Sequence, residues 1–380
     1  MIDITQSPYN CVGDDFTDNT AGINSALATG KHIYAPTGTY RTSGNHAIAT
    51  TGQRVTGDGL GATTFKITSD TNPGFVLQTG TIGVGIADCA IVRWKPSSVG
   101  SGAYGISQPA VLEKAAIERV LLRGHNIGVL LTNTDSSIMR DVVVDGNKVY
   151  GVQHQSVSGN GQCQWTFERC LFVKNGSHGY YFQAAAGSGS NSLGEYVNVS
   201  TFSNSGCGLA FFGASASDFV SGVRVLGGFF GEDGFHEILL DTYGGQHRIA
   251  NASMELVGRG NTGPQLATPA SHSGAGILLG SSNQDVVVVG VRVNGASDDG
   301  IYSEAKFLNL TGSTFTNNGL STLLKNGIHI AGGQANVVGN TSGNVGGSTS
   351  QNYGLYRDPS ATVQNVGNLF MANQVAPTFP

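Results

Sequence analysis

The sequence predicts an all-β protein, a solenoid in the form of a parallel β-helix, with a short N-terminal capping helix. Glycine contributes 57 of the 380 residues, yet the chain has only 10 prolines and no Gly-X-Y period, which excludes collagen. Charged residues make up only 12% of the chain, so uncharged polar residues must cover most of the surface. A glycine followed by an apolar residue also recurs along most of the chain, as repeat proteins require.

The recurring glycines mark successive turns of the predicted coil, called rungs below. The spacings between them are 31, 23, 23, 28, 29, 26, 42, 24, 27 and 27 residues. The eleven positions are Gly74, Gly105, Gly128, Gly151, Gly179, Gly208, Gly234, Gly276, Gly300, Gly327 and Gly354. A period of this length is typical of one rung of a β-helix.

Each repeat carries further strand signals upstream of its glycine. Residues 117–122, 138–144 and 167–172 are apolar runs, and polar turns such as Asn175-Gly176 follow them. Asn and Gly tolerate the left-handed backbone conformation that such turns need. One rung cannot bury its inward side chains alone, so the rungs must stack about 4.8 Å apart.

The N-terminal segment, residues 1–44, is predicted to cap the first rung, and residues 45–380 form one β-helix domain. Within the cap, residues 19–27 are predicted to form a short helix that begins at Asn19 and places Ile23, Ala26 and Leu27 on one face. Residues 374–380 offer no such cap, so we expect a partner chain or a further domain at that end. Insertions at 184–194, 213–217 and 257–273 are expected to project beside a binding groove.

Composition excludes several classes of function. The net charge of −5 and the absence of a Lys/Arg run argue against nucleic-acid binding. Five cysteines without a C-x-x-C pair indicate neither a disulfide framework nor a zinc site, and no metal is expected. The N-terminus lacks the pattern of a signal peptide, and no window is apolar enough for membrane insertion. The chain is expected to fold in a reducing cytoplasm.

Residues 10–43 contain Asp-Phe-Thr-Asp-Asn-Thr-Ala-Gly-Ile-Asn-Ser-Ala-Leu, followed by Ile-Tyr-Ala-Pro-Thr-Gly-Thr-Tyr. This segment resembles the first turn of pectate-lyase-like β-helices, and especially bacteriophage tailspikes and capsule depolymerases. Asp15 stands where that family usually has Gly, and Asn19 where it usually has Asp. The resemblance implies a right-handed, homotrimeric β-helix on a phage tail or baseplate. Such a protein binds and cleaves a bacterial surface polysaccharide, capsule or O-antigen, outside the cell and without a cofactor.

Hydrolysis of a glycosidic bond needs two carboxyl groups, one of them a general acid. The densest acidic segment of the chain lies between two of the predicted insertions and contains Glu232, Asp233, Glu237 and Asp241, with His236 among them. Glu237 is predicted to point inward, where desolvation would raise its pKa as a general acid requires. An acidic turn with a strand-end cap is the alternative interpretation. The further candidates are Glu195, Asp218 and Glu255, which solvated turns would also explain.

A polysaccharide lyase acting by β-elimination on a uronate is the second hypothesis. It requires a base and a cation that neutralises the substrate carboxylate. The residues that could serve are His236, Tyr181, His178 and Arg248. Arg119, Arg140 and Arg169 occupy similar places in three consecutive rungs, where they form either a cationic ladder for an acidic polymer or a row of exposed turn residues.

Side chains should alternate inward and outward along the strand after each glycine. The second-position column contains Tyr181, Tyr302, His329 and Tyr356, together with Gln153 and His236, and the fourth-position column contains Gln155, Gln183, Glu304 and Asp358. Gln153, Tyr181, Gln183 and Tyr302 are the predicted glycan-binding residues. A solvated or trimer-facing surface explains the same pattern, and a non-catalytic receptor-binding tail fibre is the third hypothesis.

Overall fold

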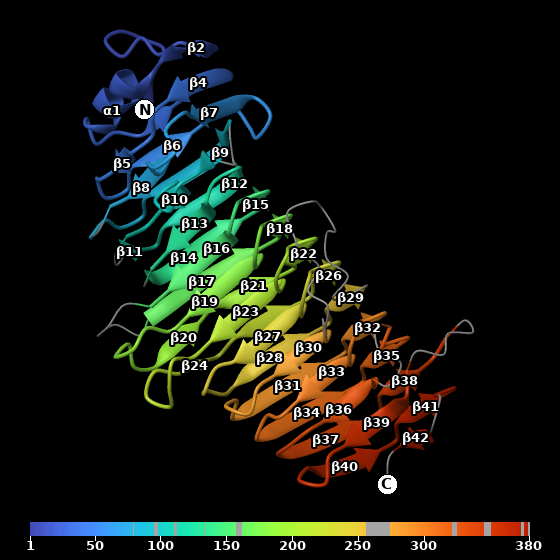
Figure 1. The fold of residues 1–380 in the computed structure, drawn as a ribbon. Helices are drawn as coiled ribbons and strands as arrows, with labels where there is room; N and C mark the ends of the chain where they lie inside the picture. Colours follow the sequence, from blue (N-terminus) through green and yellow to red (C-terminus); the bar gives the residue numbers. More distant parts are fainter. Residues whose placement is uncertain are drawn as a thin grey trace.

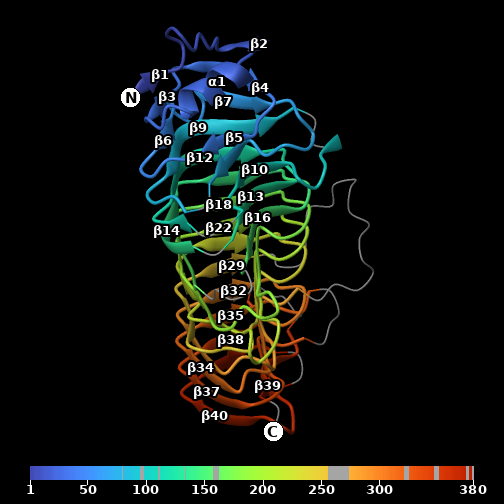
Figure 2. The same ribbon diagram turned by 90° about the vertical axis from the view of Figure 1, so that its left-hand side faces the viewer.

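The computed structural model describes residues 1–78, 80–94, 98–109, 112–132, 134–156, 162–255, 274–320, 325–345, 351–373 and 376–378. It confirms the right-handed parallel β-helix, an elongated coil with the two termini at opposite ends (Figure 1, Figure 2). All strand pairings between rungs are parallel, within one sheet of 29 strands and one of 13. No described helix is long and apolar enough to span a membrane.

The 13-stranded sheet, called the second sheet, receives one strand from each rung. Its strands are β5 (His46–Ile48), β8 (Phe75–Leu77), β10 (Tyr104–Ser107), β13 (Ile127–Leu131), β16 (Tyr150–Gln155), β19 (Tyr180–Gln183), β23 (Leu209–Phe212), β27 (Ile238–Asp241), β30 (Ile277–Leu279), β33 (Ile301–Ser303), β36 (Ile328–Ile330), β39 (Tyr353–Arg357) and β42 (Ala376–Thr378). Eleven of them are the strands predicted from the repeats, and β5 and β42 extend the sheet at its ends.

The 29-stranded sheet, called the first sheet, bends at a corner into two rows. The first row contains β1 (Ile2–Asp3), β3 (Ile33–Tyr34), β6 (Arg54–Thr56), β11 (Leu112–Glu113), β14 (Thr134–Arg140), β17 (Gln162–Glu168), β20 (Asn191–Leu193), β21 (Glu195–Val197), β24 (Val220–Ser221), β25 (Arg224–Leu226), β28 (His247–Ala250), β31 (Asp285–Val289), β34 (Phe307–Thr311), β37 (Gln334–Val338) and β40 (Thr362–Val366). The second row contains β2 (Asp14–Asp18), β4 (Gly38–Thr42), β7 (Thr63–Ile67), β15 (Val143–Asp145), β18 (Leu171–Val173), β22 (Ser200–Phe202), β26 (Phe229–Gly231), β29 (Ser253–Glu255), β32 (Arg292–Asn294), β35 (Thr314–Thr316), β38 (Thr341–Gly343) and β41 (Leu369–Met371). The strands β9 (Gly85–Arg93) and β12 (Ala116–Arg123) run through both rows.

Stacked inward side chains form one continuous core along the coil axis. Apolar residues that directly follow the repeat glycines, such as Val152, Leu209 and Ile277, are fully buried and lie in register with buried residues of the neighbouring rungs. Aromatic rings fill the middle of the coil, where Phe167 and Tyr196 stack with their centroids 5.0 Å apart. Each rung therefore buries its apolar face against the next rung, as the repeat pattern predicts.

An internal ladder of amide side chains closes the corner before the second sheet. Asn147 donates from Nδ2 to Asn175 at 2.9 Å, and Asn175 donates to Asn204 at 2.8 Å. Asn204 donates to Asp233 at 2.8 Å, so the ladder ends on a carboxylate. Each member also accepts a backbone N–H from the preceding rung, which satisfies donors that would otherwise be buried without partners.

The repeat glycines are required by space inside the coil. A Cβ at Gly128 would lie 2.6 Å from the Gly151 carbonyl oxygen and would also collide with Val144. We expect Gly128→Ala to lower the free energy of unfolding by about 1–3 kcal/mol, because the interior cannot accommodate an added methyl group. Gly61→Ala is the matched control, since nothing lies within 4 Å of its Cβ position. Equal unfolding midpoints for the two variants in urea would contradict this account.

The register corrects one predicted rung. Gly234 does not occupy the glycine column, because Leu209 pairs with Ile238 and Gly208 is therefore level with Glu237. The outward second position of this rung is Leu239 and not His236. A glutamate thus stands where the adjacent rungs have glycine, and its side chain enters the crowded interior of the coil.

The N-terminal segment contains the predicted helix, α1 (Thr20–Leu27), with Ile23, Ala26 and Leu27 buried. Asn19 is the N-cap residue, as predicted, but its side chain makes no hydrogen bond to the first turn of the helix. The Asn19 amide instead bonds the Val12 backbone in both directions, and the Asp18 carboxylate accepts from the Thr20 N–H at 3.0 Å. The strands β1 to β4 of this segment pair within the first sheet, so residues 1–44 also supply the first turn of the coil.

Two of the predicted insertions connect the second sheet to the next rung of the first sheet. Residues 184–194 follow β19 and include β20, and residues 213–217 lie between β23 and β24. The third insertion, 257–273, lies outside the described residues, as does most of the C-terminal segment 374–380.

Candidate functional site

The predicted acidic cluster is divided between the interior and the surface. Glu237 and Asp233 have no exposed surface, and Asp233 accepts from Thr201 Oγ1 at 2.6 Å as well as from the ladder. Burial, and then the negative charge of Asp233, raise the pKa of Glu237 well above its usual value. The inward orientation of Glu237 agrees with the prediction, but burial keeps both carboxyl groups away from any polymer outside the coil.

The other members of that cluster lie apart from one another. Glu232 is exposed at the corner between β26 and the turn, where it accepts from Ser203 Oγ at 3.2 Å. Asp241 ends β27 on the outer face of the second sheet. His236 accepts the Ala275 N–H at Nδ1 (3.1 Å), and burial lowers its pKa to about 4. The structure therefore does not gather these three side chains into one site.

The further acidic candidates are engaged in local structure. Glu195 forms an ion pair with Arg224 at 3.0 Å, along a polar groove of about 650 Å³ on the first sheet. Asp218 accepts the Gly189 N–H at 2.9 Å, and such backbone hydrogen bonds lower its pKa. Glu255 ends β29. None of the three lies on the second sheet.

The arginines proposed as a cationic ladder are ion-paired. Arg119 contacts Asp88 at 2.5 Å, Arg169 contacts Asp141 at 2.7 Å, and Arg140 contacts Glu168 at 2.7 Å. Arg119, Asp141 and Arg169 occupy the left-handed corner between the two rows of the first sheet, with φ near 50°, whereas Arg140 precedes the corner. Charges of opposite sign alternate along this corner, which leaves no uniform positive surface for an acidic polymer. Arg248, on β28, lies on a different sheet from Tyr181.

An aromatic surface lies on the outer face of the second sheet in its middle rungs, and we call it the aromatic platform. It comprises Tyr150, His178, Tyr181 and Phe212. The rings of Tyr150 and Tyr181 are stacked with centroids 4.7 Å apart, and His178 is parallel to both, at 5.8 and 5.4 Å. Phe212 extends the row at 5.7 Å from Tyr181. Burial lowers the pKa of His178 to about 4, so the row is uncharged at neutral pH.

Amide side chains border the aromatic platform. Gln153 pairs in register with Tyr181, and Gln155 with Gln183. The Tyr181 hydroxyl donates to Gln183 Oε1 at 2.7 Å. Aromatic faces beside amide donors and acceptors are the combination that binds sugar rings. Three of the predicted binding residues, Gln153, Tyr181 and Gln183, are thus brought together on one face.

A second group on the same face unites carboxylates with a histidine, and we call it the acid–histidine cluster. It comprises Asp299, Tyr302, Glu304, His329, Tyr356 and Asp358. His329 Nδ1 lies 3.0 Å from Asp299 Oδ2, and Nε2 lies 3.4 Å from Asp358 Oδ1. The Tyr302 and Tyr356 rings meet the imidazole at about right angles, with centroids 4.9 and 5.0 Å away. These contacts fix the plane of the imidazole from both sides.

The protonation of this cluster follows from its contacts. Burial alone would lower the pKa of His329, but the hydrogen bonds and charges of Asp299 and Asp358 outweigh it and raise the pKa. Burial also raises the pKa of Tyr302, as does its hydroxyl donation to Glu304 Oε1 at 2.8 Å. Tyr302 therefore stays protonated and donates to Glu304. Asp299 is only 1% exposed, whereas the Asp358 side chain is 36% exposed and accessible to a ligand.

Glu304 and Asp358 are a carboxyl pair on the outside of the coil. They follow β33 and β39, two rungs apart, which separates their backbones by roughly 10 Å. Inverting glycosidases hold their two carboxyl groups about 6.5–9.5 Å apart. The aromatic platform ends at β23, three rungs or roughly 14 Å before β33. A single extended polymer could therefore contact both groups.

Sequence reasoning found the column positions of His329, Glu304 and Asp358 but did not select them as catalytic. The signal was available, because stacking places residues about 27–30 positions apart side by side. Asp299 belongs to neither of the two outward columns, because it precedes the repeat glycine Gly300 and the columns were counted from the residues that follow each glycine.

No known protein-family profile matches the chain, and no curated protein sequence matches it. Solved structures share its fold. The A-module of the Azotobacter vinelandii mannuronan C-5 epimerase AlgE4 superimposes with a TM-score of 0.70 at 17% identity, covering 100% of this chain and 97% of the epimerase module. A pre-mature gene product 12 of bacteriophage phi29 gives 0.67 at 14% identity, and this chain spans about half of its length, 53%. A GH87 α-1,3-glucanase from Streptomyces thermodiastaticus gives 0.50 at 15% identity, over 97% of this chain and 68% of the glucanase. The similar structures thus include β-helix proteins that act on polysaccharides.

Proposed function

We propose that the protein is a polysaccharide depolymerase that hydrolyses a bacterial surface glycan held along the outer face of the second sheet. The observation that carries the proposal is the alignment of the aromatic platform with the acid–histidine cluster on one face. Polysaccharide-acting enzymes among the similar structures support it. The catalytic centre moves, relative to the prediction, from the buried Glu237 and Asp233 to Glu304 and Asp358.

Each residue has a role in this proposal. Glu304, oriented by the hydrogen bond from the Tyr302 hydroxyl, is the general base that takes a proton from water. Asp358 is the general acid that protonates the glycosidic oxygen as the C–O bond breaks. His329 faces Asp358 through Nε2 and is the source of the proton that Asp358 passes to the glycosidic oxygen. Water adds to the anomeric carbon, and each cleavage yields one new reducing end.

The charge of the cluster favours hydrolysis over β-elimination. Four carboxyl groups face two cations here: Asp298, Asp299, Glu304 and Asp358 against Lys325 and His329. Lys325 is already paired with Asp298 at 2.8 Å. A lyase must neutralise the carboxylate of a uronate, which this excess of negative charge would repel. The glycan cut here is therefore proposed to be uncharged at the cleaved linkage.

The proposed setting is a homotrimer on a bacteriophage tail. The likeness of residues 10–43 to the first turn of tailspikes supports this setting, as do the phage proteins among the similar structures. Light scattering of the purified chain should report three times the monomer mass of 39.2 kDa. A monodisperse monomer would remove this part of the proposal without affecting the catalytic part.

The activity is tested on a panel of bacterial capsular polysaccharides and lipopolysaccharides. Polymer size, reducing ends and the absorbance of unsaturated uronates should be followed together. Shortening with new reducing ends and without added absorbance is expected. Added absorbance would establish a lyase, and binding to one polymer without shortening would establish a receptor-binding protein.

The aromatic platform should contribute binding and not chemistry. We expect Tyr181→Ala to weaken binding of the cleaved polymer by about 2- to 13-fold, since stacking on an aromatic ring is worth roughly 0.5–1.5 kcal/mol. The rate at saturating polymer should change little. Phe307→Ala, an exposed aromatic residue at the start of β34 in the first sheet, is the control for loss of an aromatic surface. Unchanged affinity of the Tyr181 variant in calorimetry would contradict the role of the platform.

A further inference from the structure

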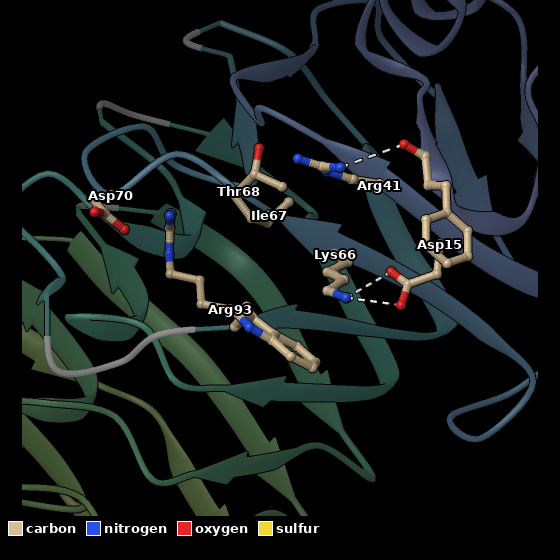
Figure 3. Close-up of a pocket in the computed structure, with 9 residues that line it drawn as sticks. Asp15, Arg41, Lys66, Ile67, Thr68, Asp70 and Arg93 are labelled. Atoms are coloured by element: carbon tan, nitrogen blue, oxygen red, sulfur yellow. Dashed lines mark hydrogen bonds and ion pairs between the residues drawn. The ribbon is translucent and has the colours of Figure 1, made fainter.

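A pocket of about 590 Å³ lies at the N-terminal end of the coil, on the second row of the first sheet (Figure 3). It is lined by Asp15, Phe16, Arg41, Lys66, Thr68, Asp70, Arg93 and Trp94 together with Ile67. These residues come from β2, β4, β7 and the end of β9 with the turns that follow. The rung of β9 continues into β10, which lies eight rungs before β36, so the pocket is distinct from the acid–histidine cluster.

Two of the three cations in the pocket are already engaged. Lys66 Nζ contacts both oxygens of Asp15, at 2.7 and 2.8 Å, and lies 4.0 Å from the centre of the Trp94 ring. The Arg93 guanidinium is buried and donates to His125 and to the carbonyl oxygens of Ser69 and Asn72. Both side chains are therefore fixed parts of the pocket wall.

Arg41 is different. Its guanidinium makes one long contact, 3.5 Å from Nη1 to the Phe16 carbonyl oxygen, drawn in Figure 3. Within the described part of the chain no carboxylate lies within 4.0 Å of it. The pocket lining carries three cations and two carboxylates, and Asp18, in register with Arg41 on the neighbouring strand, is a third carboxylate that acts on Arg41 at longer range. An exposed guanidinium is suited to bidentate binding of a carboxylate.

The walls offer apolar ring surfaces beside this cation. Phe16 is 80% exposed and Trp94 is 70% exposed, the two largest exposures among the described aromatic side chains. Asp15 holds its part of the wall with a positive φ of 65°, which is unfavourable for a residue other than glycine, while its carboxylate fixes Lys66. Sugar rings stack on such aromatic faces through their C–H groups.

We infer that this pocket binds a hexuronate unit of an acidic polysaccharide, with its ring on Trp94 and its carboxylate on Arg41. This binding site goes beyond the proposed hydrolase and does not depend on it. The acid–histidine cluster repels anionic sugars, whereas this pocket attracts them. A polymer with both neutral and uronate units would be anchored here and cut elsewhere on the coil.

The test uses the α-1,4-linked tetramer of galacturonic acid and its carboxyl-reduced, neutral counterpart, added to the full chain. Calorimetry gives the affinity, and tryptophan fluorescence gives the location. Of the two tryptophans, Trp165 is buried, so a shift on binding reports Trp94. We expect the acidic tetramer to bind with a saturable fluorescence change and the neutral tetramer to bind at least about tenfold more weakly.

Variants connect that signal to the pocket. Arg41→Gln should lower the affinity for the acidic tetramer to that of the neutral one, and Trp94→Ala should abolish binding without loss of folding. Arg292→Gln, an exposed arginine on β32 in the same row, is the matched control and should bind like the parent protein. Glu304→Gln should also bind normally, which separates this site from the proposed catalysis.

Three results would overturn the inference. They are equal affinity for the two tetramers, unchanged affinity in Arg41→Gln, and absence of binding by the parent protein at millimolar ligand. A trimer that dissociates when Trp94 or Phe16 is replaced by alanine would also overturn it, because the aromatic side chains would then belong to a contact between subunits.

Discussion

Replacing Glu304 with glutamine should reduce the rate of polymer cleavage by about 10²- to 10⁴-fold, the usual contribution of a general base. The amide keeps the size of the side chain and can still accept a hydrogen bond from Tyr302, so the fold and glycan affinity should not change. Reducing-end formation at saturating polymer measures the rate, and calorimetry on the inactive variant measures the affinity. Asp358→Asn should cause a loss of the same order, because the acid and the base act in one step.

Asp241→Asn provides the matched control for these variants. Asp241 lies in the same outward column as Glu304, two rungs earlier, and it belonged to the acidic segment first predicted to be catalytic. It should retain full activity. Full activity in Glu304→Gln together with loss in Asp241→Asn would move the catalytic centre back to β27.

Replacing Glu237 with glutamine should stabilise the protein in neutral and alkaline solution. The pKa of Glu237 is raised in the folded state by burial and by Asp233, so folding retains a proton that the unfolded chain releases. The penalty is absent below the pKa of the unfolded chain and grows as the pH rises towards the folded pKa. Each unit by which the pKa is raised costs about 1.4 kcal/mol once the pH exceeds both values.

The measurement is urea unfolding of the parent and Glu237→Gln proteins from pH 4 to pH 9. The free energy of unfolding of the variant minus that of the parent should increase as the pH rises over this range, because only the parent carries the Glu237 penalty. Asp233→Asn should act in the same direction, since it continues the asparagine ladder of the three preceding rungs. Glu113→Gln, at an exposed strand end, should follow the parent curve. Parallel curves for the parent and Glu237→Gln would refute the account of a buried Glu237 with a raised pKa.

The fold was predictable because the inward side of the coil is repetitive. Glycine followed by an apolar residue marks a place where a Cβ would collide with the interior, so the spacing of Gly128, Gly151 and Gly179 gives the length of the rungs directly. The prediction failed at one rung, where Gly234 lies three residues before the true position. In that rung Glu237 occupies the position of the repeat glycine. A search for recurring glycines cannot locate a rung whose glycine has been replaced by another residue.

The candidate site was harder to predict because proximity in this fold runs across the rungs and not along the chain. Glu232 and Asp233 are adjacent in sequence, yet the corner leaves Glu232 exposed outside the coil and buries Asp233 inside it. Asp299, His329 and Asp358 are about 30 residues apart, yet they are in contact. Whether these three side chains lie side by side depends on the lengths of the loops between the strands, which must set the strand register to within one residue. The irregular spacing of the repeat glycines obscures that register in the sequence.

The nearest-rung packing of the core has a consequence for how such a protein can change its specificity. An outward side chain on the second sheet touches the rungs directly above and below it, and its replacement leaves the stacked interior undisturbed. Tyr181, Tyr302 and His329 belong to this outer layer, whereas Tyr180, Ile301 and Ile328, one residue before each, belong to the core. Alternate residues of the same strand thus determine ligand recognition and folding. Substitutions at the outward positions can therefore change the ligand specificity of one rung without altering the core of the next.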